Sequence, residues 1–244
     1  MVARLGKRLR DAVKKRAHLA AYDSGYVVYG KSRLPFGVDL AADIGKLVKR
    51  GAIPAPRVVF DIGANVGDWS AYIKRNFPES QIEAFEPVPD TFQALSQRVA
   101  ALGGVRTWNC ALGAEPGLAL MAHTGGGGNT LVNVTASTHN KITVEVNTLD
   151  RMSAAQNFPA VDLLKIDCEG FEMPILRGAA AVLAAPGPRL VYCECEFHKG
   201  ETPHGDFFEI YQHLTPLGYK FVTLYTEGSG RDGFIFGSAL FLRT

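Results

Sequence analysis

The feature that most constrains the fold is an apolar run that ends in a glycine turn and continues as a helix. Residues 58–67 read Val-Val-Phe-Asp-Ile-Gly-Ala-Asn-Val-Gly, and residues 68–76 carry apolar side chains at helical spacing. A short run that is apolar at consecutive positions is typical of a strand covered on both faces, as in parallel sheets. The segment therefore predicts an open α/β fold whose ligand binds at the C-terminal end of this strand.

The same alternation of strand and helix repeats along the chain. Further strands are predicted at 81–85, 107–110, 163–167 and 190–194, and further helices at 90–102, 172–184 and 206–217. Such alternation indicates a mostly parallel sheet with right-handed crossovers. Two pairs of strand-like runs break the pattern: 118–123 with 142–146 predict an inserted β-hairpin, and 219–225 with 234–242 predict an antiparallel hairpin at the sheet edge. Residues 51–244 are expected to form one domain.

The first fifty residues differ from this domain in charge. The whole chain has a formal net charge of +2, but seven basic residues and one acidic residue fall within the first 16 positions. Leu5, Leu9, Val13 and Ala17 recur at helical spacing among them, so residues 1–50 are predicted to be a basic helical extension. Such a helix suits contact with an anionic membrane surface, or it serves as a lid or homodimerisation arm on the main domain.

The rest of the chain is slightly acidic, which excludes the basic surface that nucleic-acid-binding proteins use to contact phosphates. No apolar stretch approaches the roughly 20 residues of a membrane-spanning helix, and the N-terminus lacks the apolar region of a secretory signal. A cytoplasmic location is therefore expected. The cysteines do not show the spacing of a zinc site; they are Cys110, Cys168, Cys193 and Cys195.

The glycine turn differs from that of dinucleotide-binding proteins. Its spacing is D-x-G-x-x-x-G, whereas a nicotinamide or flavin site reads G-x-G-x-x-G. A carboxylate at this turn would repel a pyrophosphate but attract a cationic ligand without phosphate. Glycines here let the backbone approach the ligand. The candidate cofactor contacts in the turn are Asp61, Gly63, Ala64, Asn65 and Gly67.

Two more strand ends carry candidate cofactor contacts. Glu86 and Pro87 follow the second strand, and an acidic residue about 20 positions beyond a glycine turn can accept hydrogen bonds from ribose hydroxyls. The alternative is a surface glutamate at the end of a strand. Cys110 and Ala111 end the third strand, where their backbone groups could face an adenine ring.

Four runs of residues resemble the FkbM-type methyltransferases: 60–67, 85–87, 109–113 and 164–172, within roughly residues 57–195. The last run is the most specific, because the family reads I-K-I-D-x-E-G-x-E followed by a helix and Leu-x-Gly, here residues 176–178. The resemblance implies a class I methyltransferase sheet of order 3-2-1-4-5-7-6 with the last strand antiparallel. It also implies S-adenosylmethionine (SAM) as methyl donor and a hydroxyl acceptor on a sugar or natural product. SAM is cationic at sulfur and has no phosphate, in agreement with the charge of the turn.

Methyl transfer to a hydroxyl is an in-line displacement that needs a proton acceptor. Asp167 ends the fourth strand and is a candidate general base or cofactor ligand, although an aspartate there can also cap a helix. Glu169 lies two residues further on. His198, beyond the fifth strand, is a candidate proton acceptor or a surface histidine.

Carboxylates near these strand ends leave a metal open as a third alternative. Asp167, Glu169, Glu194 and Glu196 offer oxygen ligands for a divalent ion, but paired carboxylates have several other uses, and no metal site is assigned. Two competing functions also remain open: an NAD-type oxidoreductase and a non-catalytic SAM-binding protein. The sequence does not specify the acceptor.

Overall fold

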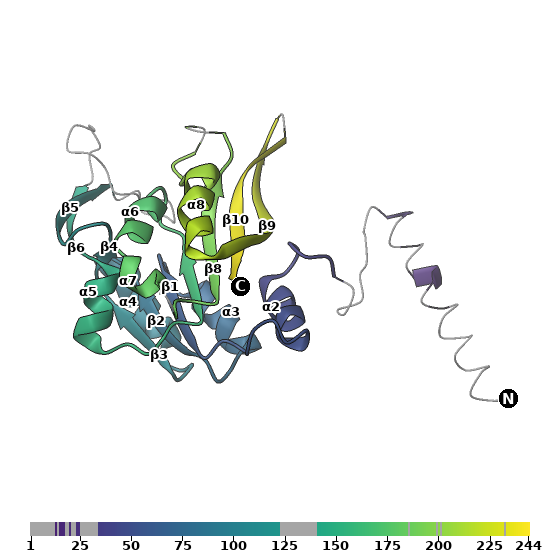
Figure 1. Ribbon diagram of the computed structural model, residues 1–244, viewed down its shortest axis with the longest axis horizontal. Coiled ribbons are helices and arrows are strands. Elements are labelled where there is room, and N and C mark those ends of the chain that lie inside the picture. Colours follow the sequence, from purple (N-terminus) through teal and green to yellow (C-terminus); the bar gives the residue numbers. More distant parts are fainter. Residues whose placement is uncertain are drawn as a thin grey trace.

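The computed structural model describes residues 13, 15–17, 20, 23–24, 34–122, 141–184, 186–198, 200, 202–231 and 233–244. Its centre is a seven-stranded sheet in the order β3-β2-β1-β7-β8-β10-β9 (Figure 1). The strands are β1 (Val58–Ile62), β2 (Gln81–Phe85), β3 (Val105–Trp108), β7 (Leu163–Ile166), β8 (Leu190–Glu196), β9 (Tyr219–Gly230) and β10 (Gly233–Arg243). Strands β1, β2, β3, β7 and β8 pair in parallel, and β10 is antiparallel to both β8 and β9. The predicted strand order and antiparallel last strand are confirmed.

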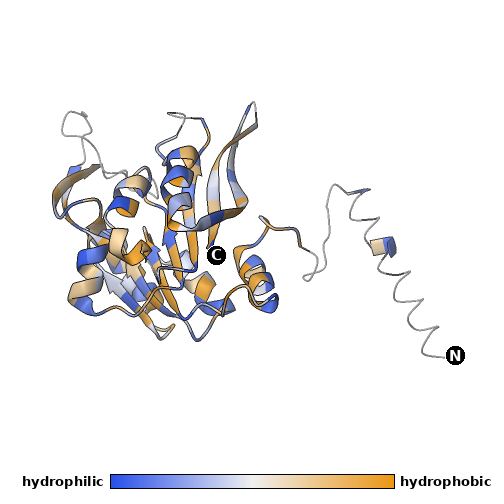
Figure 2. Cartoon of the chain, in the orientation of Figure 1, coloured by the Kyte–Doolittle hydropathy of each residue, from blue (hydrophilic) through white to orange (hydrophobic). Residues whose placement is uncertain are grey.

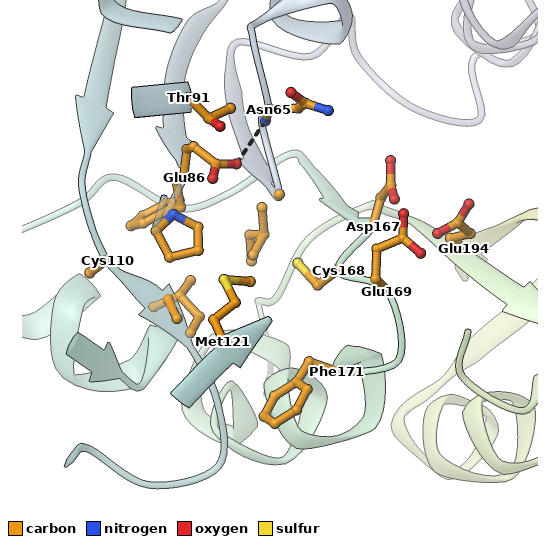
Figure 3. A pocket seen from close by; sticks show the side chains of 16 residues that line it. Asn65, Glu86, Thr91, Cys110, Met121, Asp167, Cys168, Glu169, Phe171 and Glu194 are labelled. Carbon is orange, nitrogen blue, oxygen red and sulfur yellow. Dashed lines mark hydrogen bonds between the residues drawn. The ribbon is translucent and has the colours of Figure 1, made fainter. Parts of the chain in front are cut away.

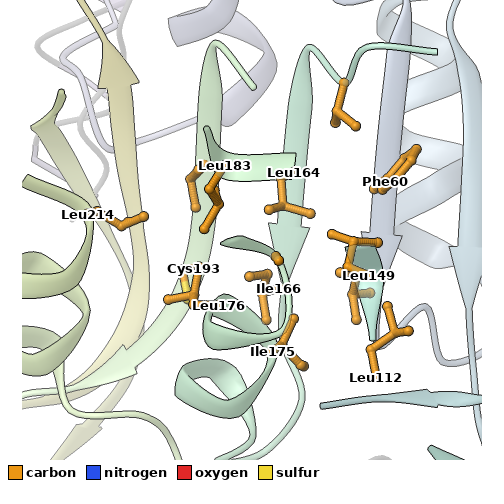
Figure 4. Packing of buried hydrophobic residues seen from close by; sticks show 14 of the residues in the cluster. Phe60, Leu112, Leu149, Leu164, Ile166, Ile175, Leu176, Leu183, Cys193 and Leu214 are labelled. Carbon is orange, nitrogen blue, oxygen red and sulfur yellow. The ribbon is translucent and has the colours of Figure 1, made fainter. Parts of the chain in front are cut away.

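Helices cover both faces of this sheet. One face carries α2 (Leu40–Lys49), α3 (Asp68–Asn76) and α4 (Pro89–Val99), and the other carries α5 (Leu149–Gln156), α6 (Glu172–Arg177), α7 (Ala180–Leu183) and α8 (Phe207–Leu214). Figure 2 shows largely hydrophobic central strands and helices with both hydrophilic and hydrophobic residues. Each face has its own core, as the side chains between α5–α8 and the sheet illustrate (Figure 4). Burial on both faces explains the uninterrupted apolar strands.

A second, smaller sheet has the order β4-β6-β5, with β4 (Ala111–Leu112), β5 (Gly117–Ala122) and β6 (Lys141–Asn147). Strands β5 and β6 are antiparallel, as expected of the inserted hairpin. The third strand of the main sheet was predicted at 107–110, but β3 ends at Trp108. The side chain of Asn109 donates hydrogen bonds to the backbone carbonyls of Glu86 and Pro87, and Ala111 then pairs with β6. The glycine run at 125–128 lies outside the described residues.

Three further details differ from the sequence-based expectation. Helix α5 was not predicted; its first turn is capped by Thr148, whose hydroxyl accepts from the Arg151 amide. The predicted helix 172–184 is split into α6 and α7 around Gly178, which packs so closely on Gly113 that a Cβ would lie 2.0 Å from its carbonyl oxygen. Strands β9 and β10 extend almost to the tip of their hairpin.

The N-terminal extension is described only in part. Residues 13, 15–17, 20 and 23 are helical, and the interpretation of the segment as membrane contact, lid or dimerisation arm rests mostly on residues outside the described ones. Its last helix, α2, packs on the domain, because Leu40, Ile44 and Leu47 are buried against the sheet. Among the described residues, no helix has the length and apolar content needed to cross a membrane.

Candidate active site

A cavity of about 250 Å³ opens at the C-terminal edge of β1, β2, β7 and β8 (Figure 3). Eight of the predicted site residues line it: Gly63, Asn65, Glu86, Pro87, Cys110, Ala111, Asp167 and Glu169. Four others do not: Asp61, Ala64, Gly67 and His198. In Figure 3, Asn65 and Glu86 lie on one side of the cavity, and Asp167, Glu169 and Glu194 lie on the other.

Asp61 is fully buried and does not line the cavity. Its carboxylate accepts a hydrogen bond of 2.6 Å from the Ser70 hydroxyl, and its other oxygen lies 3.1 Å from Nζ of Lys165. Lys165 also donates to the carbonyl of Gly63 at 2.7 Å and lies 3.3 Å from a carboxylate oxygen of Asp167. Burial alone would lower the pKa of Lys165, but Asp167 and Asp61 raise it above its usual value, so the lysine is charged. The Asp61 carboxylate therefore stabilises the turn rather than facing the cavity.

The two glycines of the turn are required mainly by packing. Gly63 has φ of +76°, and a Cβ there would lie 1.8 Å from the carbonyl oxygen of Asp167. Gly67 has φ of +87°, and its Cβ would lie 2.8 Å from the Leu95 side chain of α4. Gly63 thus lets the β1 turn pass directly beside the β7 turn, and only Gly63 of the two glycines also lines the cavity.

Glu86 joins the end of β2 to the glycine turn. Its carboxylate accepts hydrogen bonds from the amides of Asn65 at 3.1 Å and Val88 at 2.9 Å. The residue is only 6% exposed, and burial raises the pKa of its carboxyl above the usual value. Glu86 is therefore a fixed, partly desolvated acceptor at the cavity wall.

The backbone amides of the turn are also largely occupied. Those of Gly63 and Ala64 donate to the carbonyl of Phe85, that of Asn65 donates to Glu86, and that of Gly67 donates to the carbonyl of Ala64. A pyrophosphate site needs such amides to be directed at the ligand. This arrangement disfavours a dinucleotide.

The Asp167–Glu172 turn connects β7 to the segment that follows β8. The buried carboxylate of Glu172 accepts from the amides of Cys168 and Gly170 in its own turn, and from the amide of Gly205 at 2.8 Å. Gly170 has φ of +98°, and a Cβ there would lie 2.0 Å from the carbonyl oxygen of Pro203. These two residues therefore hold the segment around residues 203–205 against the Asp167–Glu172 turn.

This segment brings in a histidine that the sequence analysis did not single out. The side chain of His204 is 6% exposed, and its Nδ1 lies 2.9 Å from Oε2 of Glu194 and 3.7 Å from Oε2 of Glu169. Its ring packs on Phe236 with a centroid distance of 4.4 Å. His198, the predicted candidate, is exposed. A histidine between proline and glycine just before a helix was the only sequence signal, and it does not reveal that Glu169 is near.

The carboxyl groups of Asp167 and Glu194 act as a pair. Desolvation and the nearby Asp167 carboxylate raise the pKa of Glu194 well above its usual value. Burial would also raise the pKa of Asp167, but Lys165 and a hydrogen bond with Glu194 hold it below its usual value. The two shifts have opposite directions, so Asp167 is the carboxyl of the pair that loses its proton more readily. The Asp167 side chain is 41% exposed and therefore remains accessible from the cavity.

Glu196 orders the chain beyond β8 rather than lining the cavity. Its carboxylate accepts from the amide of Gly200 at 2.8 Å and from the amide and hydroxyl of Thr202 at 2.9 and 2.8 Å. Burial would raise the pKa of Glu196, but these hydrogen bonds lower it below its usual value. It therefore shapes the path of the chain toward His204.

Comparison with known proteins gives a consistent assignment. A sequence profile described as the Methyltransferase FkbM domain matches residues 61–221. Methyltransferase 1 of Beauveria bassiana is 32% identical over 158 residues, covering 55% of this chain and 63% of that protein. The hexuronic acid methyltransferase AglP of Haloferax volcanii is 26% identical over 147 residues, covering 60% of this chain and 58% of that protein. The matches thus span less than two thirds of these relatives.

The fold also matches solved structures. The crystal structure of a methyltransferase FkbM from Methylobacillus flagellatus superimposes with a TM-score of 0.55 at 15% identity, covering 88% of this chain and 48% of that one. At this level of identity, the likeness concerns the fold.

Proposed function

The chain belongs to the FkbM methyltransferase family, and on this premise we propose that it transfers a methyl group from SAM to a hydroxyl group of a sugar or natural-product small molecule. The observation that carries the proposal is the cavity at the strand ends, with a hydrogen-bond acceptor for a nucleoside on one side and a group of carboxyls on the other. Because the matches cover only part of each relative, the activity of the whole protein is part of this proposal.

The cofactor side of the cavity fits SAM. When bound, SAM supplies a methyl group on a positively charged sulfur. Glu86 would accept hydrogen bonds from the ribose hydroxyls, since its oxygens are held in place by the Asn65 and Val88 amides. Gly63 and Asn65 would contact the methionine portion, and Cys110 and Ala111 the adenine. The occupied amides of the turn favour this cofactor over NAD.

The acceptor side suggests how the proton is removed. We assign Asp167 as the general base, because it is ionised, reaches the cavity and is held by Lys165. The acceptor oxygen forms a bond to the methyl carbon while the carbon–sulfur bond breaks and its electron pair stays on sulfur. The hydroxyl proton passes to Asp167. Glu169 lies beside this path, whereas His198 is exposed and plays no part in the proposal.

One relative and the polarity of the site support the proposed acceptor class. AglP is named for a hexuronic acid, and hydroxyl-rich acceptors suit a cavity edge with several carboxyl groups. A cytoplasmic location belongs to the same proposal and agrees with the four free cysteines.

Calorimetric titration of the full chain with SAM, with its demethylated product S-adenosylhomocysteine (SAH) and with NAD tests the cofactor. We expect binding of SAM and SAH and none of NAD; binding of NAD alone would overturn the proposal. Mass spectrometry of a panel of uronic acids and neutral sugars incubated with SAM then tests the reaction. A mass increase of one CH2 unit is expected, because a methyl group replaces the hydroxyl hydrogen, whereas methylation of nitrogen acceptors alone would contradict O-methyl transfer.

A further inference from the structure

Two buried polar atoms on the acceptor side lack a hydrogen-bond partner within the described part of the chain. They are Nδ1 of His204 and Oε2 of Glu194, on side chains that are only 6% and 7% exposed. The atoms lie 2.9 Å apart, a distance at which a protonated imidazole and a carboxylate form an ion pair, but no hydrogen bond joins them. Buried polar atoms in folded proteins nearly always have a partner, so this pair indicates that a further group binds between them.

A third ligand atom is close by. Carboxylate oxygens of Glu169 and Glu194 and a ring nitrogen of His204 all lie within 4.8 Å of one another, and Oε2 of Glu169 is 3.7 Å from Nδ1 of His204. Ligand atoms about 2.1 Å from a metal ion stand roughly 3.0 to 3.4 Å apart in octahedral or tetrahedral sites. We infer that Glu169, Glu194 and His204 bind a divalent transition-metal ion at the acceptor side of the cavity.

The ligand types select the ion. One imidazole with two carboxylates suits Mn²⁺, Fe²⁺, Co²⁺ or Zn²⁺, whereas Mg²⁺ and Ca²⁺ prefer oxygen ligands only. Two ionised carboxylates balance the charge of a divalent ion. The site therefore accepts a cation without creating a net buried charge.

The neighbouring contacts hold the histidine in position. Phe236 packs on the His204 ring, Glu172 accepts from the amide of Gly205, and the missing side chain of Gly170 lets Pro203 approach. Residues that orient metal ligands in this way commonly change metal affinity 10- to 100-fold when they are altered. Several specific contacts therefore position this one buried histidine next to two carboxyl groups.

The position of the site indicates that the ion binds the acceptor, and this role of the ion rests on the proposed function. Glu169 and Glu194 line the same cavity as Asp167, so an ion held by these two carboxylates would lie beside the place assigned to the acceptor. Three protein ligands with open positions are typical of catalytic metal sites. An acceptor with two neighbouring oxygens, such as a vicinal diol or an α-hydroxy acid, would bind the ion through both and present one hydroxyl to Asp167.

Manganese binding tests the site directly. The full chain is treated with a chelator, dialysed and titrated with Mn²⁺, and the free ion is followed by electron paramagnetic resonance. We expect one ion per chain and at least a tenfold loss of affinity in His204→Gln and in Glu194→Gln. The matched control is His198→Gln, which alters an exposed histidine of the same connection between β8 and α8 and should bind as the parent does. No binding by the parent, or equal binding by His204→Gln, would overturn the site.

Two further measurements distinguish a failure of the metal site from a failure of the methyltransferase proposal. Glu169→Gln alters a ligand that is not fully buried, so it gives a second test if the His204 variant does not fold, as judged by circular dichroism. Calorimetric titration with SAH is run on the same samples. SAH binding without Mn²⁺ binding overturns the metal site and leaves the methyltransferase proposal intact, while Mn²⁺ binding without SAH binding does the reverse.

Discussion

The cofactor side of the cavity, formed by Gly63, Asn65 and Glu86, differs from the acceptor side in how its polar groups are paired. On the cofactor side, the turn amides already donate to backbone carbonyls or to Glu86, whose carboxylate accepts from the amides of Asn65 and Val88. On the acceptor side, the ring nitrogen of His204 and an oxygen of Glu194 are buried next to each other without a hydrogen bond. The first side is complete before any ligand binds, whereas the second is completed by a ligand.

The two sides also differ in how far apart their residues lie along the chain. Residues 58–86 supply most of the cofactor side as one strand-helix-strand unit, while the acceptor side combines the ends of β7 and β8 with the segment before α8. A site built from one local unit retains its geometry readily. A site built from three segments depends on the contacts that hold them together, which here are made by Gly170 and Glu172.

The largest expected effect is on the acceptor side. Asp167→Asn removes the proposed proton acceptor, so turnover should fall about 10²- to 10⁴-fold, the usual contribution of a general base. The affinity for SAH should change little, because Glu86 and the turn are untouched. Methyl-transfer assays and calorimetry measure both quantities, with Asp90→Asn on the exposed start of α4 as control. Turnover equal to that of the parent would show that the base lies elsewhere.

Lys165→Met tests the ion pairs beneath both sides. The lysine is 2% exposed and neutralises the fully buried Asp61, so its loss should lower the free energy of unfolding by about 3 to 5 kcal/mol. The double variant with Asp61→Asn should recover much of this loss, because no uncompensated buried charge remains. Urea denaturation measures the difference. If the double variant were as unstable as Lys165→Met, the unpaired charge of Asp61 would not be the cause of the lower stability.

Gly170→Ala should affect the acceptor side selectively. Its φ of +98° and the 2.0 Å approach to Pro203 oppose any Cβ, with a cost of about 1 to 3 kcal/mol for the strained backbone alone. We expect a raised KM for the acceptor and unchanged SAH affinity. Gly218→Ala is the matched control for the cost of the strained backbone alone, because Gly218 has φ of +89° and open space around its Cβ position. Identical kinetics in both variants would argue against a role for the Pro203 contact.

The smallest expected effect is on the cofactor side. Glu86→Gln keeps the shape of the side chain but loses its charge, and the new amide group cannot accept from both Asn65 and Val88. Hydrogen bonds to charged groups contribute about 1.5 to 3 kcal/mol, so SAH affinity should fall roughly tenfold or more. Calorimetric titration measures it, with the exposed Glu115→Gln as control. Unchanged affinity would place the ribose away from Glu86.

Much of the fold could be predicted from local patterns. Strand β2 and helix α3 have the predicted bounds, and the strand order, the inserted hairpin and the edge hairpin are confirmed. Hydrophobic periodicity is a property of neighbouring residues, so it locates elements well. The split of the helix at Gly178 and the early end of β3 could not be predicted in this way, because both depend on contacts with distant backbone.

The candidate site was predicted unevenly for the same reason. Glu86 and Asp167 follow strands whose ends meet at one edge of a parallel sheet, and both line the cavity. Asp61 was interpreted as a ligand-facing carboxylate, but the register of β1 with β7 places it directly opposite Lys165. A charged residue within each of two apolar strands was the available signal for that pair.

The sequence by itself determined that a strand, a glycine turn and a helix would form a ligand-binding edge, because spacing and residue type control local conformation. It also identified the family through the run at 164–172. Only the tertiary structure decided that His204 rather than His198 joins the carboxyl groups of Glu169 and Glu194. Burial and distance between segments determine which charges interact, and neither is a property of a single stretch of chain.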